Sequence, residues 1–479
     1  MGQEIGSSQF RPEDFQRFQD RLRQETTLLG EWFAQRVLSD HGKMGGFELE
    51  VWLVDEHSRP KAVNDAYLTL TEARNLPVVP ELARFNVELN SEPRLLQGDV
   101  LSRMRFELDS TWRQCCELGR QIDTSLMMIG ILPTVKDSEL TLANISNAKR
   151  FLALNDQVLR LRNGRPLEIE IDGRETLRTQ HGDVMLESAA TSFQLHVQVA
   201  VSQVLRYYNA AHVLSAPMVG ISANSPYLFG RDLWDETRIP LFEQAVAMED
   251  IYGREGGRAG RVTFGARYIE SSVHECFLRN LDCYPVLLPA HLDAPPEELA
   301  HLRLHNGTIW RWNRPLIGFD AKGTPHVRIE HRVVPAGPTV IDAVANAALF
   351  FGALESMAHS DIPVERRLGF EQARANFYAA AKHGLRAELV WLDGKRVSML
   401  ELLEHEILPM ARQGLQSLDV NEADADDFLG VIEARIQTRC NGAAWQRQYV
   451  ARHGANMEQL ACAYHQRQQQ GQPVHEWSV

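Results

Sequence analysis

The chain has 479 residues, with 63 acidic and 50 basic side chains and a formal net charge of −13. This acidic balance argues against a nucleic-acid-binding surface, which needs clustered Lys and Arg to neutralise phosphate. The six cysteines show no metal-ligand spacing and are expected to be reduced thiols. The longest apolar run, 343–354, is shorter than the roughly 20 residues of a membrane span, and the N-terminus lacks a signal-peptide pattern. We therefore expect a cytoplasmic protein.

Apolar spacing predicts the order of the elements along the chain. In the first half we expect, in order, a helix at 13–39, a strand at 44–55, a helix at 63–78, a strand at 85–92, a helix at 99–128 and a strand at 127–132. A hairpin with strands at 159–162 and 167–171 is expected around the Asn163-Gly164 turn. The next predicted elements are a strand at 192–200, a helix at 203–220, a loop-rich section at 222–300, a strand at 326–334 and a helix at 339–358.

After residue 360 the pattern is mostly helical. Helices are expected at 367–383, 398–415, 422–438 and 442–468, followed by a frayed Gln-rich tail at 466–472. The clean alternation of polar and apolar residues in the strands favours antiparallel pairing. The sequence thus predicts an α+β fold with an antiparallel sheet packed by helices, a core at 1–360 and a mostly helical C-terminal part of the same unit at 361–479.

Four of the expected strands have an ordinary apolar face and a second face with unusual chemistry. Strand side chains alternate, so each second set points to one side of the sheet. The four sets are Glu48 and Glu50; Asn86, Glu88, Asn90 and Glu92; Gln194, His196 and Gln198; and Arg328, Glu330 and Arg332. Carboxylates, a His, Arg and amides without Lys are typical of a cage for hard divalent cations and an anionic substrate.

Each set also has a simpler interpretation. Glu48 and Glu50, two residues apart, repel one another unless a cation or water screens them, so a metal role competes with a solvent-facing strand. Glu88 and Glu92 could belong to an exposed edge strand, and His196 could be a structural residue that ligates no metal and binds no substrate. Glu330 could form a plain ion-pair ladder with its neighbouring arginines, or it could bind metal while Arg328 and Arg332 meet phosphate.

Two further segments are candidates for substrate contact. The stretch 305–315 is dense in aromatics and Arg, so Arg314 and then Arg311 are expected to clamp a substrate carboxylate while Trp310 and Trp312 exclude water. In the alternative, the two Trp rings belong to the core or to a partner surface. The basic, Gly-rich stretch 253–261 lacks a P-loop ending. It either closes over phosphates through Arg258 or is a solvated loop.

Taken in order, these motifs resemble the glutamate–cysteine ligase type 2 family, carboxylate–amine ligases with a glutamine-synthetase-like fold. The matching stretches run from about 44 to 390 and are Gly46-Phe47-Glu48-Leu49-Glu50, Glu88-Leu89-Asn90-Ser91-Glu92, the strand around His196, Ser222-Ala223-Asn224-Ser225-Pro226-Tyr227, Arg328-Ile329-Glu330-His331-Arg332 and the helix that ends at Gly384-Leu385. The resemblance implies ATP, Mg²⁺ or Mn²⁺, and a γ-glutamyl phosphate that an amine attacks.

The resemblance also implies roles for residues and small-molecule substrates for the site. Arg332, helped by Arg328, would face the transferring phosphoryl group, and Gln194, Asn90 and His196 would contact substrate. By the match, the metal-facing residues would be Glu48, Glu50, Glu88, Glu92 and Glu330, with His196 as a further ligand. No nucleic-acid or membrane partner is implied, and a homo-oligomer is left open.

Three positions depart from the family pattern: Gln194 where a His is usual, Leu132 where the family has a His before Pro133, and Pro335 near a usual Asp. Two alternatives to a ligase stay open. One is a phosphotransferase of the same fold, and the other, which these three departures keep open, is a non-catalytic sensor of nucleotides or amino acids. The sequence does not identify the amine.

Overall fold

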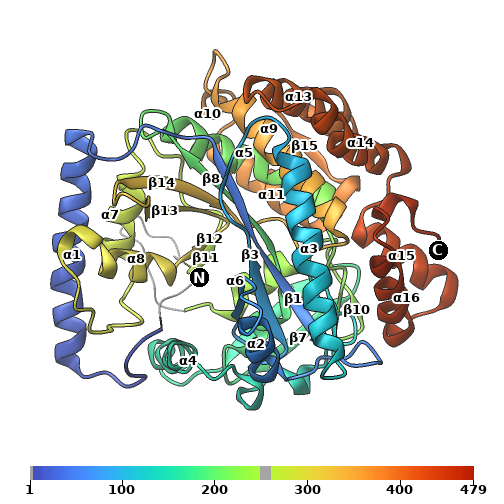
Figure 1. Cartoon of the computed structure of the whole chain (residues 1–479), viewed down its shortest axis with the longest axis horizontal. Helices are drawn as coiled ribbons and strands as arrows, with labels where there is room; N and C mark the ends of the chain where they lie inside the picture. Colours follow the sequence, from blue (N-terminus) through green and yellow to red (C-terminus); the bar gives the residue numbers. More distant parts are fainter. Residues whose placement is uncertain (1–3, 249–259) are drawn as a thin grey trace.

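The structure, a computed structural model, describes residues 4–248 and 260–479. At its centre is an antiparallel sheet in the order β13–β14–β8–β1–β3–β2, and β4 and β5 also pair with β1 (Figure 1). The strands of this sheet are β1 (Met44–Val54), β2 (Val78–Pro80), β3 (Asn86–Asn90), β4 (Arg94–Leu95), β5 (Ser125–Met127), β8 (Phe193–Val199), β13 (Asn313–Phe319) and β14 (Pro325–His331). The expected α+β fold with an antiparallel sheet is confirmed.

Helices surround the sheet, with α1 on one side and the C-terminal helices on the opposite side (Figure 1). The helices are α1 (Pro12–Gln35), α2 (Asn64–Glu72), α3 (Val100–Arg120), α4 (Lys149–Leu161), α5 (Val204–Ser222), α6 (Arg238–Ala245), α7 (His274–Cys283), α8 (Ala300–Gly307), α9 (Val340–Ala358), α10 (Val364–Arg367), α11 (Phe370–His383), α12 (Met399–Leu402), α13 (Leu408–Ser417), α14 (Glu422–Thr438), α15 (Gly442–His453) and α16 (Met457–Gln470). Short strand pairs are β6 (Leu167–Asp172) with β7 (Thr176–His181), β9 (Tyr227–Leu228) with β10 (Arg231–Asp232), β11 (Val262–Thr263) with β12 (Trp310–Arg311), and β15 (Glu388–Val390) with β16 (Arg396–Ser398).

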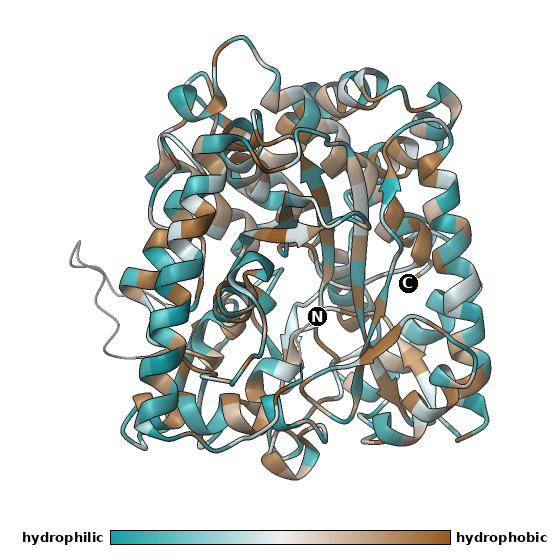
Figure 2. Ribbon diagram, turned by 60° about the vertical axis from the view of Figure 1, so that its left-hand side comes forward, coloured by the Kyte–Doolittle hydropathy of each residue, from teal (hydrophilic) through white to brown (hydrophobic). Residues whose placement is uncertain are grey.

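The two faces of the sheet have opposite character. Phe47, Leu49 and Val51 of β1 point into a large apolar core that also contains the buried faces of α5 and α9. In Figure 2 hydrophobic residues concentrate in the central strands and the helices against them, while hydrophilic residues gather on the outer helices. The apolar face is therefore covered, and the sheet's polar residues share the other face.

Helix α9 is apolar because it lies inside the protein. By length and composition alone it could cross a membrane, but 89% of its most apolar stretch is buried in the fold. A side chain on Gly414 of α13 would lie only 1.8 Å from the carbonyl oxygen of Gly352, so α9 and α13 pack backbone against backbone. The apolar run expected to be too short for a span is thus part of a longer core helix.

One predicted hairpin is wrong. Residues 159–161 are the end of α4, and Asn163 and Gly164, both with positive φ, end that helix. The hairpin in this region forms instead between β6 and β7. The Asn-Gly pair serves equally well as a helix stop, because both residues accept the left-handed conformation.

The C-terminal part is helical as expected, but its end is better ordered than predicted. The single helix expected at 442–468 is two helices, α15 and α16, separated at Gly454 with φ of 90°. The Gln-rich tail does not fray, because Gln468 is buried and its side-chain oxygen accepts a 3.0 Å hydrogen bond from the Met128 amide. The loop-rich section contains α6 and α7.

Candidate functional site

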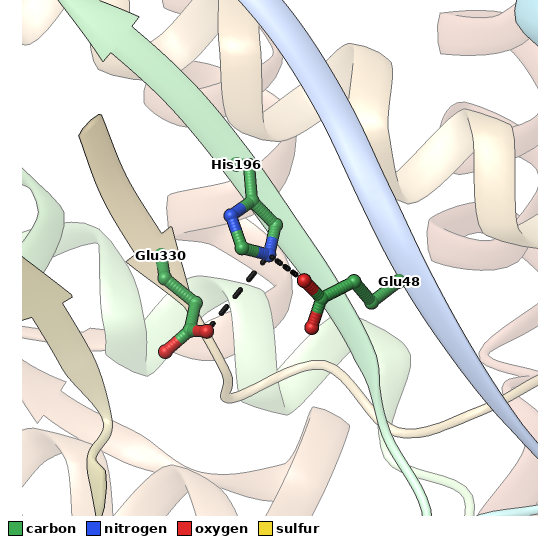
Figure 3. A group of neighbouring side chains, drawn as sticks. All are labelled: Glu48, His196 and Glu330. Atoms are coloured by element: carbon green, nitrogen blue, oxygen red, sulfur yellow. Dashed lines mark ion pairs between the residues drawn. The ribbon is translucent and has the colours of Figure 1, made fainter. Parts of the chain in front are cut away.

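Three side chains from three adjacent strands converge on the polar face of the sheet (Figure 3). His196 Nε2 of β8 lies 3.4 Å from Glu48 Oε1 of β1 and 3.9 Å from Glu330 Oε1 of β14. All three residues are buried. Among the described residues, Glu48 Oε2 and both His196 ring nitrogens have no hydrogen-bond partner. We call Glu48, His196 and Glu330 the inner group; its unpaired atoms leave coordination free for a cation.

Two arginines of the chain balance the charge of Glu330. Arg314 Nε and Nη2 donate to its two oxygens at 2.6 and 2.9 Å, and Arg332 Nη1 lies 3.3 Å away. Burial alone would raise the pKa of Glu330, but the Arg314 and Arg332 guanidinium groups hold it well below its usual range. Burial likewise opposes a lowered pKa of Glu48, which the neighbouring His196 produces.

A second carboxylate set lines a cavity of about 350 Å³ next to the inner group. Glu50, Glu81 and Glu88 bring their oxygens within 4.8 Å of one another, and Glu187 lines the same cavity. Burial and the charge of Glu48 raise the pKa of Glu88 to about 7, and burial and Glu50 raise that of Glu187 to about 8. Burial and Glu88 raise the pKa of Glu81 well above its ordinary value. We call Glu50, Glu81 and Glu88 the outer group.

The same cavity is also lined by arginines. Its arginines are Arg150, Arg303, Arg314, Arg328 and Arg332. Within the described ranges, Arg328 Nε has no hydrogen-bond partner, and burial together with the like charge of Arg328 lowers the pKa of Arg303. Two like charges held together in a cavity favour a polyanionic ligand between them.

Gln194 and Asn90 are positioned to orient the carboxylates. Gln194 Nε2 donates to Glu50 Oε1 at 2.7 Å, while its oxygen accepts a hydrogen bond from Arg332. Asn90 Nδ2 donates to Glu88 Oε1 at 3.2 Å. The side chain of Gln194 therefore links the Glu50 carboxylate to the Arg332 guanidinium. Leu132 lies in the apolar core, and Pro335 packs against Gly130, where an added Cβ would approach its ring to 2.9 Å.

Two predicted residues, Glu92 and Arg311, lie elsewhere. Glu92 is exposed beyond the end of β3 and belongs to neither carboxylate group, because the strand ends at Asn90, before Pro93. Arg311 lies outside the cavity, contrary to expectation, since alternation in β12 directs Trp310 into the cavity and Arg311 into a separate pocket. Arg258 lies outside the described residues.

Sequence reasoning missed Glu81, Glu187 and Arg303. Glu81 directly follows β2, and Val79 of β2 pairs with Glu88. The available signal in the sequence was the short strand-like run Val-Val-Pro immediately before this acid. Glu187 lies in a 3₁₀ turn at Met185–Ala189 and Arg303 in α8, and neither has a local pattern that indicates a site.

The donor set fits a divalent cation of the Mg²⁺ or Mn²⁺ type. Carboxylate oxygens dominate both groups and one imidazole contributes to the inner one, whereas a zinc site would favour more His or Cys. Without a cation, the outer group is a set of mutually repelling acids with raised pKa values. The chemistry of these residues is therefore that of a metal and phosphate site.

Comparison with known proteins agrees with this geometry. A model of glutamate-cysteine ligase family 2 matches residues 44–471, while no curated protein matches the sequence. The fold is similar to a glutamate–cysteine ligase from Francisella tularensis in complex with AMP, at a TM-score of 0.51, 11% identity and coverage of 92% of this chain and 91% of that one. It is also similar to a bifunctional glutathione synthetase from Pasteurella multocida, at a TM-score of 0.53, 10% identity and coverage of 93% of this chain and 54% of that one.

Proposed function

The chain belongs to glutamate–cysteine ligase family 2, a family of carboxylate–amine ligases, and from this premise we propose that it consumes ATP to join the γ-carboxyl group of glutamate to an amine. The observation that carries the proposal is that one cavity is lined both by carboxylates and by arginines. A polyphosphate ligand that is bridged by cations needs carboxylates to hold the cations and arginines to contact its oxygens. The AMP in the Francisella enzyme supports nucleotide use by this fold.

The two carboxylate groups would hold Mg²⁺ or Mn²⁺, Glu48, His196 and Glu330 at one position and Glu50, Glu81 and Glu88 at another. Bound there, such ions would neutralise phosphate charge and polarise the transferring group. Arg303 and Arg328, which line the cavity, would bind phosphate oxygens. Arg332, tied to Glu330 and Gln194, would stabilise the charge that grows on the phosphoryl group.

The proposed reaction has two steps that share the cavity. A glutamate carboxylate oxygen attacks the γ-phosphorus of ATP and ADP leaves, which forms an acyl phosphate. The amine nitrogen then attacks the acyl carbon, phosphate leaves and the nitrogen loses a proton. Glu187 lines the cavity, and its pKa of about 8 is close enough to neutral for it to take part in proton transfer, accepting that proton in its deprotonated form.

Phosphate release tests this proposal. The protein is incubated with Mg-ATP and glutamate against a panel of amines that includes cysteine, and products are identified by mass spectrometry. We expect amine-dependent phosphate release together with a new amide mass. Phosphate release without an amide would indicate a phosphotransferase or hydrolase, and Mg-ATP binding without turnover of any pair would contradict the ligase.

A further inference from the structure

A second pocket, of about 250 Å³, lies on the other side of β12 from the catalytic cavity. It is bounded by α5, α7 and the segment 265–269, and it shares no lining residue with the catalytic cavity in the described part of the chain. Trp310 faces the cavity and Arg311 faces this pocket, which we call the Arg311 pocket.

Arg311 is the unusual feature of this pocket. It is only 3% exposed, yet Nη1 and Nη2 have no hydrogen-bond partner among residues 4–248 and 260–479. Its guanidinium carbon lies 5.8 Å from the centre of the Tyr284 ring, a contact that compensates only part of the desolvation cost of a buried charge. A buried cation of this kind normally has an anionic partner.

The acids that line the pocket are not that partner. Glu275 Oε1 accepts hydrogen bonds from the amides of Ser271 and Ser272, and its Oε2 lies 3.8 Å from Arg267. Asp282 is exposed, and no ion pair joins either acid to Arg311 in the described structure. A second donor lines the same pocket, since the buried Tyr268 hydroxyl also has no hydrogen-bond partner there.

We propose that the Arg311 pocket binds a compact oxyanion, a carboxylate or a phosphate group, between the Arg311 guanidinium and the Tyr268 hydroxyl. The planar fork of Arg suits two oxygens of either group. The site is separate from the proposed catalytic cavity, so the inference does not depend on the ligase chemistry.

Cys283 provides a local probe for this site. It lines the Arg311 pocket and is partly exposed, whereas none of the described residues lining the catalytic cavity is a cysteine. The protein is treated with a maleimide in the presence of inorganic phosphate, acetate or chloride at equal ionic strength. Mass spectrometry then measures the rate at which Cys283 is alkylated under each condition. Cys462, partly exposed and outside the pocket, is the internal reference.

We expect phosphate or acetate to protect Cys283 but not Cys462, and the more effective anion identifies the ligand class. Arg311→Met should abolish protection, and Tyr268→Phe, which removes a single hydroxyl, should raise the protecting concentration several-fold while the fold is retained. Arg113→Met, at an exposed position on α3, is the matched control and should behave like wild type. Protection that is unchanged in both pocket variants, or absent with both anions, would overturn the proposal.

Discussion

On β14, Glu330 is held between Arg314 and Arg332, whereas on β1 and β3 Glu50 and Glu88 face other carboxylates. All three side chains belong to the same face of the same sheet, and Glu330 and Glu88 are both fully buried. The pKa of Glu330 is nevertheless held below its usual range, while that of Glu88 is raised to about 7 by burial and the charge of Glu48.

The difference shows which charges the chain balances itself. The charge of Glu330 stabilises the fold, because it is the carboxylate that pairs with the fully buried Arg314. Neutral groups donate to the outer group: Gln194 to Glu50, Asn90 to Glu88, and the amides of Ser192 and Leu82 to Glu50 and Glu81. A cation from solution would neutralise the negative charge that remains on the outer group. A variant of Glu330 should therefore lose stability as well as activity, whereas a variant of the outer group should lose activity and keep its stability.

The largest effect is expected for Glu330→Gln. Removal of the charge takes away the carboxylate that faces the buried Arg314 and Arg332, so the variant should lose on the order of 3–5 kcal/mol of folding free energy as well as turnover. Urea denaturation and the phosphate-release assay measure the two losses. Glu388→Gln, at an exposed position of β15, is the matched control. A variant as stable as wild type would show that the ion pairs of Glu330 are not structural.

Glu88→Gln should separate activity from stability. We expect a loss on the order of 100-fold or more in kcat/KM, since a metal ligand is removed. Without divalent ions its Tm should equal or exceed that of wild type, because one of several repelling acids becomes neutral. A clear fall in Tm under these conditions would show that Glu88, like Glu330, stabilises the fold.

The pH dependence of stability should have the sign set by the outer group. A carboxyl whose folded pKa lies above its unfolded value binds more protons when folded, so its contribution to stability decreases as pH rises from about 4.5 through its folded pKa. For Glu88 and Glu187 this window extends to about pH 7 and 8. Thermal scans should show a metal-free Tm that decreases over this range, and Mg²⁺ should raise Tm more at the upper end than at the lower. Equal Mg²⁺ stabilisation at both ends would contradict the assignment.

The smallest effect is expected for Arg328→Gln, which changes one of the arginines that line the cavity. Loss of one phosphate contact should lower kcat/KM for ATP about tenfold, mainly through KM, with little change in Tm. Steady-state kinetics with varied ATP measure this, and Arg396→Gln in the exposed strand β16 is the control. A change confined to the KM of glutamate would move Arg328 to the acid substrate.

Strand alternation predicted the sheet face well, because period-two patterning is local. It brought Glu48, Glu50, Glu88, His196 and Glu330 to one side, where the register pairs Glu50 with Glu88 and Glu330 with His196. It failed at 159–164, where Asn-Gly ends a helix and does not form a hairpin turn. It also placed Glu92 in a strand that ends two residues earlier.

The rest of the site could not be predicted because it depends on tertiary packing. Glu187 reaches the cavity from a 3₁₀ turn and Arg303 from a helix, so no periodicity connects them with the sheet. Arg311 was expected in the substrate site from composition, but the direction of a side chain in a two-residue strand depends on pairing with β11. The role of Gln194 as a link between Glu50 and Arg332 likewise becomes visible only in three dimensions.

Binding of Mn²⁺, measured by electron paramagnetic resonance, tests whether the outer group is a metal site. We expect wild type to bind Mn²⁺ above the pKa range of the outer group, Glu88→Gln to bind it much more weakly while remaining folded, and Glu388→Gln to match wild type. Wild-type protein that binds no Mn²⁺, with or without nucleotide, or a Glu88→Gln variant that binds as tightly as wild type, would contradict this assignment.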